Sequence, residues 1–360
     1  MQITSIQLKN FRNLLEQRVE LTPGINIFYG DNGQGKTNFL ESLYFCAVGR
    51  SHRAVSDMEL VAFDESDAFI QLKYSEGTVH VHLGAGKKGM TVNGVPVKKL
   101  GDLLGNLIVV MFSPEDLDLI KDGPGVRRKF MDMEICKLSP LYYHELLSYY
   151  RALRQRNKLL KSIAIGRGVV DTIPVWDEAL VNHGTKVYRL RKKFAEEIGE
   201  IAAEIYRKIS GGREKIGVLY RPNITPENYA DKLSKALDRD LKLTTTTIGV
   251  HKDDLQIQIN SRDIRAFGSQ GQQRTASLSL KLAEIELIKN IRDKSPVLLL
   301  DDVLSELDEK RQSYLLSSIE GIQTIITCTG MEDVIKKVDK DAAKVFCVES
   351  GEIRGFDGIL

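Results

Sequence analysis

The sequence is poor in cysteine and tryptophan, and its few cysteines are scattered. The 360 residues include 4 Cys, 1 Trp and 9 Pro. Cys46, Cys136, Cys328 and Cys347 lie far apart and form no CxxC pair. This spacing does not fit a disulfide scaffold or a zinc site, so we expect a cytoplasmic protein whose cysteines stay reduced.

Long hydrophobic runs are absent as well. The longest, residues 107–112 and 297–300, fall well short of the about 20 residues that a membrane-spanning helix needs. Residues 1–15 contain no continuous apolar core and no small-residue cleavage site, so we expect neither a secretory signal nor a membrane partner. With 42% hydrophobic and 28% charged residues, the composition is that of an ordinary folded globule.

The whole chain has almost no net charge, but one segment of it carries a clear excess of positive charge. The chain has 51 Lys and Arg against 49 Asp and Glu, a net charge of +2. Residues 121–215 alone hold 20 basic and 12 acidic residues, a net of +8, which leaves −6 for the rest. The near-neutral total therefore conceals a basic central segment.

Hydrophobic periodicity indicates an α/β fold with an inserted lobe. Strand patterns and one helix cover the first 112 residues, where Asn93-Gly94 marks a two-residue hairpin turn. From about Pro114 to Lys242 the spacing becomes helical, and strand patterns return at 255–259, 297–300 and 323–327. We expect residues 1–112 and 245–360 to form one head and residues 113–244 to form a mainly helical, basic lobe.

A glycine-rich loop between a predicted strand and a predicted helix fits the pattern GxxxxGK[ST]. Backbone N–H groups of such a loop and of the following helix bind phosphates. Lys36 would reach the β- and γ-phosphates of a nucleotide, and Thr37 would hold Mg²⁺. The candidate nucleotide-binding residues here are Gly30, Asp31, Asn32, Gly33, Gln34, Gly35, Lys36 and Thr37.

Two aspartates supply the second half of a nucleotide site. The apolar strand 297–300 ends in Asp301 and Asp302, at the edge where α/β sheets bind ligands. We expect Asp301 to hold Mg²⁺, while Asp302 orients or deprotonates the attacking water, as Lys36 assists the phosphoryl transfer.

A second anion-ready turn opens a later helix. Residues 267–274 form a small, hydroxyl-bearing turn before an amphipathic helix. Here the sequence resembles the ABC ATPase superfamily, whose signature motif is similar to residues 269–272 and whose D-loop is similar to residues 305–308. The resemblance implies that Ser269, Gly271 and Gln272 contact ATP bound to a second copy of the chain. With one copy of each motif, it implies a head-to-tail homodimer that forms with ATP.

Three further stretches resemble the RecF family of bacterial recombination mediators. They are residues 8–13, residues 114–117 with 123–132, and residues 299–308 with Lys310 and Leu315; the resemblance extends from Met1 to beyond Asp333. It implies an ABC-type ATPase head in which Arg12 approaches the nucleotide phosphates. It also implies a DNA-stimulated ATPase switch in DNA replication and repair that binds single-stranded, gapped or junction DNA. The resemblance further implies cooperation with RecO and RecR proteins in loading recombinase, and a part in the SOS response.

The chain departs from the ABC pattern at three places. Asp302 stands where transporter-type proteins use glutamate, which suggests slow ATP turnover. Thr327-Cys328-Thr329 stands where a switch histidine is usual, and residues 112–115 replace the Q-loop glutamine.

The basic lobe offers a candidate DNA surface. Arg151, Arg154, Lys158 and Lys161 fall within about 80° of one helical face at 100° per residue. Two clusters, Arg127-Arg128-Lys129 and Arg191-Lys192-Lys193, add further charge. A solvated helix face is the alternative, but the local excess and the family resemblance favour contact with the phosphate backbone. The candidate DNA-binding residues are Arg127, Arg128, Arg151, Arg154, Lys158 and Lys161. His251 lies in another RecF-like stretch, and its role stays open between structural and functional.

Three other functions fit the sequence less well. A transporter's nucleotide-binding subunit is the main alternative, but the RecF-like motif at 123–132 and the basic insertion argue against it. A nuclease would need more metal ligands than Asp301 and Asp302, so we expect no cleavage of DNA. A structural SMC head would need coiled-coil arms, which the short helical heptad pattern does not provide.

Overall fold

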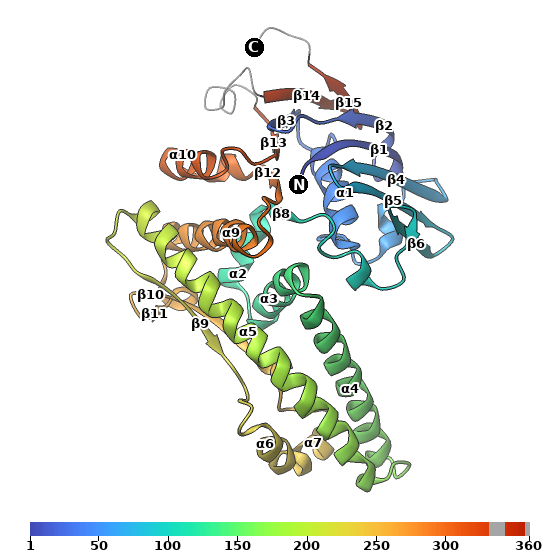
Figure 1. The fold of residues 1–360 in the computed structure, drawn as a ribbon, viewed down its shortest axis with the longest axis vertical. Coiled ribbons are helices and arrows are strands. Elements are labelled where there is room, and N and C mark those ends of the chain that lie inside the picture. Colours follow the sequence, from blue (N-terminus) through green and yellow to red (C-terminus); the bar gives the residue numbers. More distant parts are fainter. Residues whose placement is uncertain (331–342, 357–360) are drawn as a thin grey trace. The chain divides into compact units, whose positions relative to one another are not determined.

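The computed structural model describes residues 1–330 and 343–356, and these residues form two compact units (Figure 1). Unit 1 consists of Met1–Asp116 and Glu284–Leu360, and unit 2 of Leu117–Ala283. Asp333, near the far end of the RecF-like resemblance, lies outside the described residues. No helix in the described ranges is long and apolar enough to cross a membrane.

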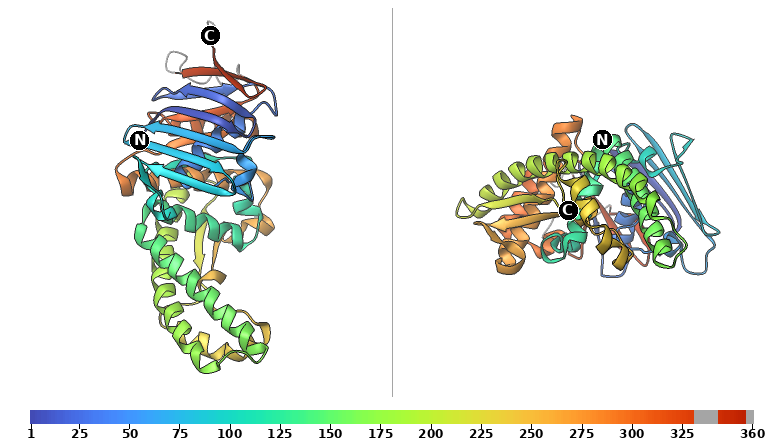
Figure 2. Two further views of the ribbon diagram at one scale, coloured as in Figure 1. Left: turned by 90° about the vertical axis from the view of Figure 1, so that its right-hand side faces the viewer. Right: turned by 90° about the horizontal axis from the view of Figure 1, so that it is seen from below.

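Unit 1 contains two six-stranded sheets. In the first, every pair of neighbours is antiparallel. Its order is β2 (Leu14–Glu20), β1 (Ile3–Phe11), β4 (Asp67–Tyr74), β5 (Gly77–Gly84), β6 (Lys87–Val92) and β7 (Val95–Pro96). Figure 2 shows these strands side by side in blue and cyan. Buried and exposed residues alternate along β4, as expected for a sheet with one face on the core.

The second sheet of unit 1 is mainly parallel. Its order is β15 (Glu352–Gly355), β14 (Ala343–Glu349), β3 (Ile25–Tyr29), β13 (Thr324–Cys328), β12 (Val297–Asp301) and β8 (Val109–Phe112). Every residue of β12 and β13 is buried, which explains their continuous apolar character. Because β13 pairs in parallel with both β3 and β12, the carboxyl ends of these three strands meet at one edge.

Helix α1 (Lys36–Val48) packs against strands of both sheets, including β4, β5, β12 and β13. Its apolar residues, such as Phe39, Leu40 and Leu43, are fully buried. The buried Gln323 also ties the sheets together, since its amide accepts from Ile3 N at 2.6 Å and donates to Ile3 O at 2.7 Å. Among the described residues, unit 1 also contains the end of α9 (Gln270–Arg292), α10 (Glu309–Ser318) and the short 3₁₀ helices η1 (Asp57–Leu60), η2 (Leu100–Asp102) and η6 (Val303–Glu306). The 3₁₀ helix η3 (Pro114–Leu117) ends at the first residue of unit 2.

Unit 2 is mainly helical. Its long helices are α3 (Pro124–Leu138), α4 (Pro140–Ala164) and α5 (Ile173–Ser210), and α4 and α5 pack against each other as a hairpin. One stripe of α5 is buried, including Val187, Phe194, Ile198 and Ile205, as the 3,4-spacing of these residues predicts. The other helices are α2 (Asp118–Lys121), η4 (Val170–Thr172), α6 (Tyr229–Lys235), α7 (Leu237–Leu243), η5 (Val250–Lys252), α8 (Ile264–Phe267) and the first part of α9 (Gln270–Arg292).

A small antiparallel sheet completes unit 2, which extends beyond the end of the lobe expected from the sequence. The sheet has the order β11 (Arg262–Asp263), β10 (Asp254–Ile259) and β9 (Ile216–Arg221). The sequence placed the end of the lobe at 244, whereas the compact units divide between Ala283 and Glu284. Part of the difference arises because β10 pairs with β9 along six residues, which places β10 in unit 2.

Candidate functional site

The glycine-rich loop follows β3, and α1 begins directly after it. Gly35 is the N-cap of α1 with a φ of 118°, no side chain caps the helix, and its first turn has no acidic residue. The helix therefore presents its N-terminal N–H groups to whatever the loop encloses. Gly30 has a φ of 156°, and a Cβ there would lie 2.1 Å from the Val348 carbonyl oxygen. The loop backbone thus requires glycine at both positions.

Lys36 is buried beneath the loop and donates to its backbone. Its Nζ lies 2.6 Å from Gly30 O and 2.8 Å from Asp31 O. Two segments brace the loop from outside: Asn13 Nδ2 and Gly351 N both donate to Gln34 O, at 3.0 Å each. The lysine begins α1 directly after the loop, as its place in the motif indicates, whereas the bracing from the β1–β2 and β14–β15 turns could not be read from the motif.

Two carboxylates lie at the end of β12, as the sequence predicted. Asp301 Oδ1 accepts from Thr37 Oγ1 at 2.9 Å and from Thr327 Oγ1 at 2.8 Å. Asp302 follows with a φ of 52°, and its N–H donates to Thr327 Oγ1 at 3.1 Å. Burial raises the pKa of the neighbouring Cys328 to about 11, with Lys36 and Asp302 close enough to influence it electrostatically. Thr327, at the position where a switch histidine is usual, thus links both aspartates to β13.

These residues suit a nucleotide with a divalent cation. The narrow glycine backbone and the uncapped helix N-terminus fit a phosphate chain. The hydroxyl of Thr37 and the carboxylate of Asp301 are hard oxygen donors, the kind that Mg²⁺ prefers.

Arg12 lies next to this loop but is held by another residue. Its Nε and Nη2 donate to the two Glu41 carboxylate oxygens at 3.0 and 3.2 Å, and its Nη1 donates to Glu59 O at 2.9 Å. Arg53 Nη2 also donates to Glu41, at 3.0 Å. Burial alone would raise the pKa of Glu41, but hydrogen bonds from Arg12 and Ser51 and the charge of Arg53 together hold that pKa below its usual value.

His52 is a further polar group of unit 1 that the sequence did not single out. Both ring nitrogens are buried and have no hydrogen-bond partner among the described residues. Burial, followed by the charge of Arg53, lowers the pKa of His52, while Glu41, Glu115 and Asp301 act in the opposite direction. The ring therefore lies within electrostatic range of the carboxylate at the end of β12.

The predicted signature turn begins helix α9 with a reciprocal cap. Gln272 N donates to Ser269 Oγ at 3.3 Å, and Ser269 N donates to Gln272 Oε1 at 2.8 Å. Gln272 Nε2 also donates to Glu214 Oε1 at 2.7 Å. Ser269 is exposed, and the preceding Phe267 is 73% exposed. The turn thus presents a hydroxyl and a large apolar side chain on the surface of unit 2.

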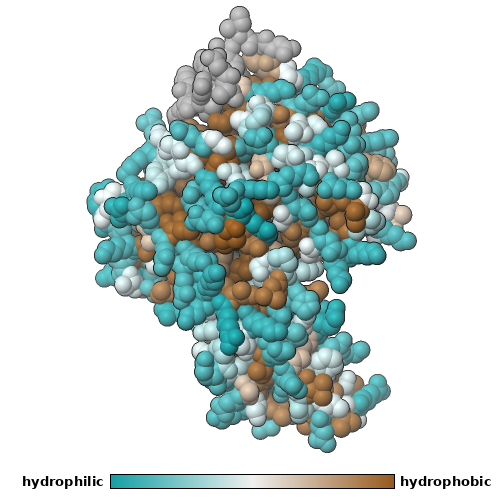
Figure 3. Space-filling model, viewed as in Figure 1, coloured by the Kyte–Doolittle hydropathy of each residue, from teal (hydrophilic) through white to brown (hydrophobic). Residues whose placement is uncertain are grey.

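The basic face of α4 lies open to solvent. Arg151, Arg154, Lys158 and Lys161 are exposed, and none of them forms a hydrogen bond or an ion pair with another side chain in the part of the chain that the structure describes. Leu153 and Leu160, on the opposite side, are buried. On the face that Figure 3 shows, hydrophilic residues of unit 2 are interspersed with hydrophobic patches. These four side chains form the α4 basic face, which is free to contact an anion.

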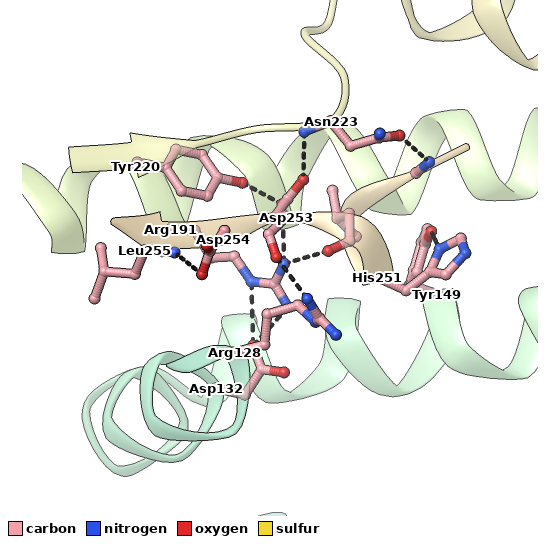
Figure 4. Close-up of polar contacts among 12 residues, drawn as sticks. Arg128, Asp132, Tyr149, Arg191, Tyr220, Asn223, His251, Asp253, Asp254 and Leu255 are labelled. Carbon is pink, nitrogen blue, oxygen red and sulfur yellow. Dashed lines mark hydrogen bonds and ion pairs between the residues drawn. The ribbon is translucent and has the colours of Figure 1, made fainter. Parts of the chain in front are cut away.

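Two arginines of the basic segment are not on the surface, and one of them, Arg127, is a candidate DNA-binding residue. Arg127 is buried, and its Nε and Nη2 donate to the two Asp254 carboxylate oxygens at 2.7 and 3.0 Å. Arg191 is fully buried between Asp132 and Asp253, at 2.8 and 2.9 Å (Figure 4). Their charges are paired with carboxylates inside unit 2, so neither guanidinium group is available at the surface.

Arg128 and His251 also take part in this interior network. Arg128 is half-buried and donates to Asp253 O at 2.7 Å, which leaves it a weak candidate for DNA contact. His251 lies 2.7 Å from Tyr149 Oη and 3.0 Å from Thr246 O, as Figure 4 shows for the tyrosine. Burial lowers the pKa of His251 to about 4. The histidine is therefore neutral and structural.

Comparison with known proteins agrees with this geometry. The family described as "RecF/RecN/SMC N terminal domain" matches residues 2–354. The chain is 44% identical to DNA replication and repair protein RecF of Lachnoclostridium phytofermentans over 357 residues, covering 98% of this chain and 99% of the relative. It is 47% identical to the protein of the same name from Agathobacter rectalis, covering 99% of each.

Solved structures give the same result. A structure of "the recombination mediator protein RecF-ATP in RecFOR pathway" is 36% identical, with a TM-score of 0.91, and the match covers 99% of this chain and 97% of that one. An Smc head domain derived from Pyrococcus furiosus is 17% identical, with a TM-score of 0.57, and shares the fold alone. The ABC-type ATPase head expected from the sequence is thereby confirmed, and the transporter alternative is not favoured. The chain belongs to the RecF family, within the wider family of RecF, RecN and SMC N-terminal domains.

Proposed function

We propose that this chain is an ATP-dependent DNA-binding protein of recombinational repair and replication, in which ATP drives dimerisation on DNA and slow hydrolysis reverses it. The observation that carries the proposal is the contact between Thr37 and Asp301 beneath a glycine loop that suits phosphates. The solved relative named with ATP supports ATP as the nucleotide.

Within the site, each residue has a distinct task. Lys36 leaves the carbonyl oxygens of Gly30 and Asp31 and binds the β- and γ-phosphates. Thr37 and Asp301 would hold Mg²⁺, which neutralises charge on the phosphates. Asp302 accepts the proton of the attacking water. Its side chain is one methylene shorter than glutamate, which favours slow turnover and the behaviour of a switch.

The second half of the ATP site comes from another copy of the chain. One phosphate loop and one signature turn per chain require two protomers in head-to-tail order to build two complete sites. The capped turn at Ser269 offers its hydroxyl and nearby N–H groups to the γ-phosphate across that interface. The exposed Phe267 gives the interface an apolar contact next to it.

DNA is the proposed partner of the α4 basic face. Four exposed cations without ion pairs suit the phosphate backbone, and the sequence has no motif for reading bases. We therefore propose recognition of DNA structure, in single-stranded, gapped or junction form. The relatives named in the RecFOR pathway support RecO-like and RecR-like partners and recombinase loading. A role in the SOS response and a cytoplasmic location stay predictions.

Mixing two inactive variants tests the shared site. Lys36→Met removes the phosphate lysine and Ser269→Arg blocks the signature turn, so each variant alone has no complete site. In a mixed dimer, one site combines the intact loop of one protomer with the intact signature of the other. The mixture should recover about a quarter of wild-type ATPase if the protomers pair at random. Recovery of no activity would reject the shared site.

A further inference from the structure

Glu41 connects three segments of unit 1 beside the phosphate loop. It lies on α1, one turn after Thr37, and its side chain is fully buried. Its carboxylate accepts from Arg12 on one side, from Arg53 on the other, and from the Ser51 hydroxyl. The buried Glu41 carboxylate thus accepts hydrogen bonds from two guanidinium groups that are far apart in the sequence.

The two arginines are attached differently. Arg12 donates through all three of its nitrogens, to Glu41 and to the Glu59 carbonyl oxygen. Arg53 uses only Nη2, which donates to Glu41 at 3.0 Å and to Asn38 Oδ1 at 2.9 Å. In the described ranges, Arg53 Nε and Nη1 have no partner, and its side chain is 34% exposed. One edge of the Arg53 guanidinium is therefore fixed while the other is available.

A chain of hydrogen bonds ties this cluster to the loop itself. Asn38, which accepts from Arg53, donates to Asn13 Oδ1 at 2.8 Å. Asn13 in turn donates to Gln34 O within the loop, at 3.0 Å. The cluster and the loop therefore form one connected structure, and a shift of either arginine would disturb the loop.

We propose that Glu41 is a positioning residue of the nucleotide site. It fixes Arg12 and Arg53 beside the loop, so that a polyphosphate meets guanidinium groups that are already oriented. Holding a long cationic side chain in place before binding removes the entropy cost of ordering it during binding. This inference rests on the proposed binding of ATP at the same loop.

A carboxylate is needed because its neighbours are donors only. Guanidinium groups offer N–H donors and no acceptor. A glutamine at the same position keeps the shape but turns one end into an NH₂ donor, which would point at an arginine. Glu41→Gln should therefore release Arg53 without opening a cavity.

The test measures ATP binding and steady-state hydrolysis for Glu41→Gln, Arg53→Ala and the double variant. Glu59→Gln is the matched control, since Arg12 contacts the carbonyl oxygen of Glu59 and not its carboxylate. We expect Glu41→Gln and Arg53→Ala each to raise the Kd for ATP about tenfold, the loss of one charge-assisted contact, and Glu59→Gln to leave it unchanged. KM should rise with kcat at saturating ATP preserved, because the arginines are held before and after ATP binds.

Coupling separates positioning from a general structural effect. If Glu41 acts by holding Arg12 and Arg53, part of its effect passes through Arg53, so the double variant should lose less ATP affinity than the two single losses combined. Full additivity of the two losses, or an unchanged Kd in Glu41→Gln, would overturn the proposal. If Glu41→Gln does not fold, Arg53→Ala still tests the proposal, because an unchanged Kd for ATP in that variant would overturn it. A wild-type chain that does not bind ATP would refute the proposed function instead.

Discussion

The Thr37 hydroxyl donates to the Asp301 carboxylate at 2.9 Å, across 264 positions of the sequence. The contact arises because β3 and β12 flank β13 in parallel, so that their carboxyl ends lie at one edge of the sheet. Thr327, from the intervening strand, donates to the same carboxylate oxygen. Sheet order therefore brings together the two halves of the proposed nucleotide site.

Asp302 is expected to control hydrolysis and not ATP binding. Asp302→Asn removes the proton acceptor while keeping the side chain's size, so hydrolysis should slow about 10²–10⁴-fold. ATP-bound dimers should persist, because Lys36, Thr37 and Asp301 are unchanged. Single-turnover hydrolysis measures the rate, and sedimentation measures the dimer. Turnover close to that of the wild type would reject Asp302 as the base.

The α4 basic face is expected to bind DNA without regard to sequence. Reversing charge at Arg154 and Lys158 should weaken binding of every DNA tested and reduce the slope of affinity against salt by about two. Lys235→Glu, an exposed lysine on α6 that already pairs with Asp231 at 2.9 Å, serves as the control. Titration of labelled duplex at several salt concentrations gives both quantities. Equal loss in the control would indicate only a general charge effect.

Arg127 should prove to be a structural residue. Arg127→Ala leaves the Asp254 carboxylate without its guanidinium partner, and breaking a buried pair costs about 3–5 kcal/mol. Lys129→Ala, an exposed neighbour on the same helix, should change stability by less than about 0.5 kcal/mol. Denaturant unfolding monitored by circular dichroism compares them. If the two variants were equally stable and Arg127→Ala bound DNA more weakly, Arg127 would have to be a DNA-contacting residue and not a structural one.

His251 should make the protein less stable in mild acid. Burial lowers its pKa to about 4, while the unfolded chain takes up a proton near pH 6.5. The unfolded state therefore binds more protons between these values, and stability falls as pH decreases from about 6.5 to about 4, by up to about 3 kcal/mol. His251→Gln should lose this part of the pH dependence. Identical pH profiles of unfolding for the two proteins would contradict the assignment.

The sequence predicted the parts of the site that are local. The glycine loop, Lys36 and Thr37 lie within one motif, and a continuous apolar strand ending in Asp301 predicts a buried strand whose carboxyl end lies at the ligand-binding edge of an α/β sheet. Each of these features depends only on neighbouring residues in the chain. In the structure, the glycine loop lies between β3 and α1, and Asp301 lies at the end of β12.

Features that depend on distant partners could not be predicted in the same way. Arg127 and Arg154 look alike in a charge count, and only the fold reveals that Asp254 neutralises one of them. Likewise, nothing near Glu41 in the sequence indicates that it holds Arg12 and Arg53. The end of unit 2 could not be read from local periodicity, because the pairing of β10 with β9 joins segments more than thirty residues apart.

The dimer is the central claim, and mass measurement with and without ATP tests it most directly. Sedimentation of Asp302→Asn should give a monomer without nucleotide and a dimer with ATP, and gapped duplex DNA should strengthen the dimer. Adding Lys36→Met removes the lysine that binds the phosphates, so this protein should stay monomeric in both conditions. Adding Lys73→Met, at an exposed strand position, should leave the behaviour of Asp302→Asn unchanged. A mass that is the same with and without ATP would contradict the account.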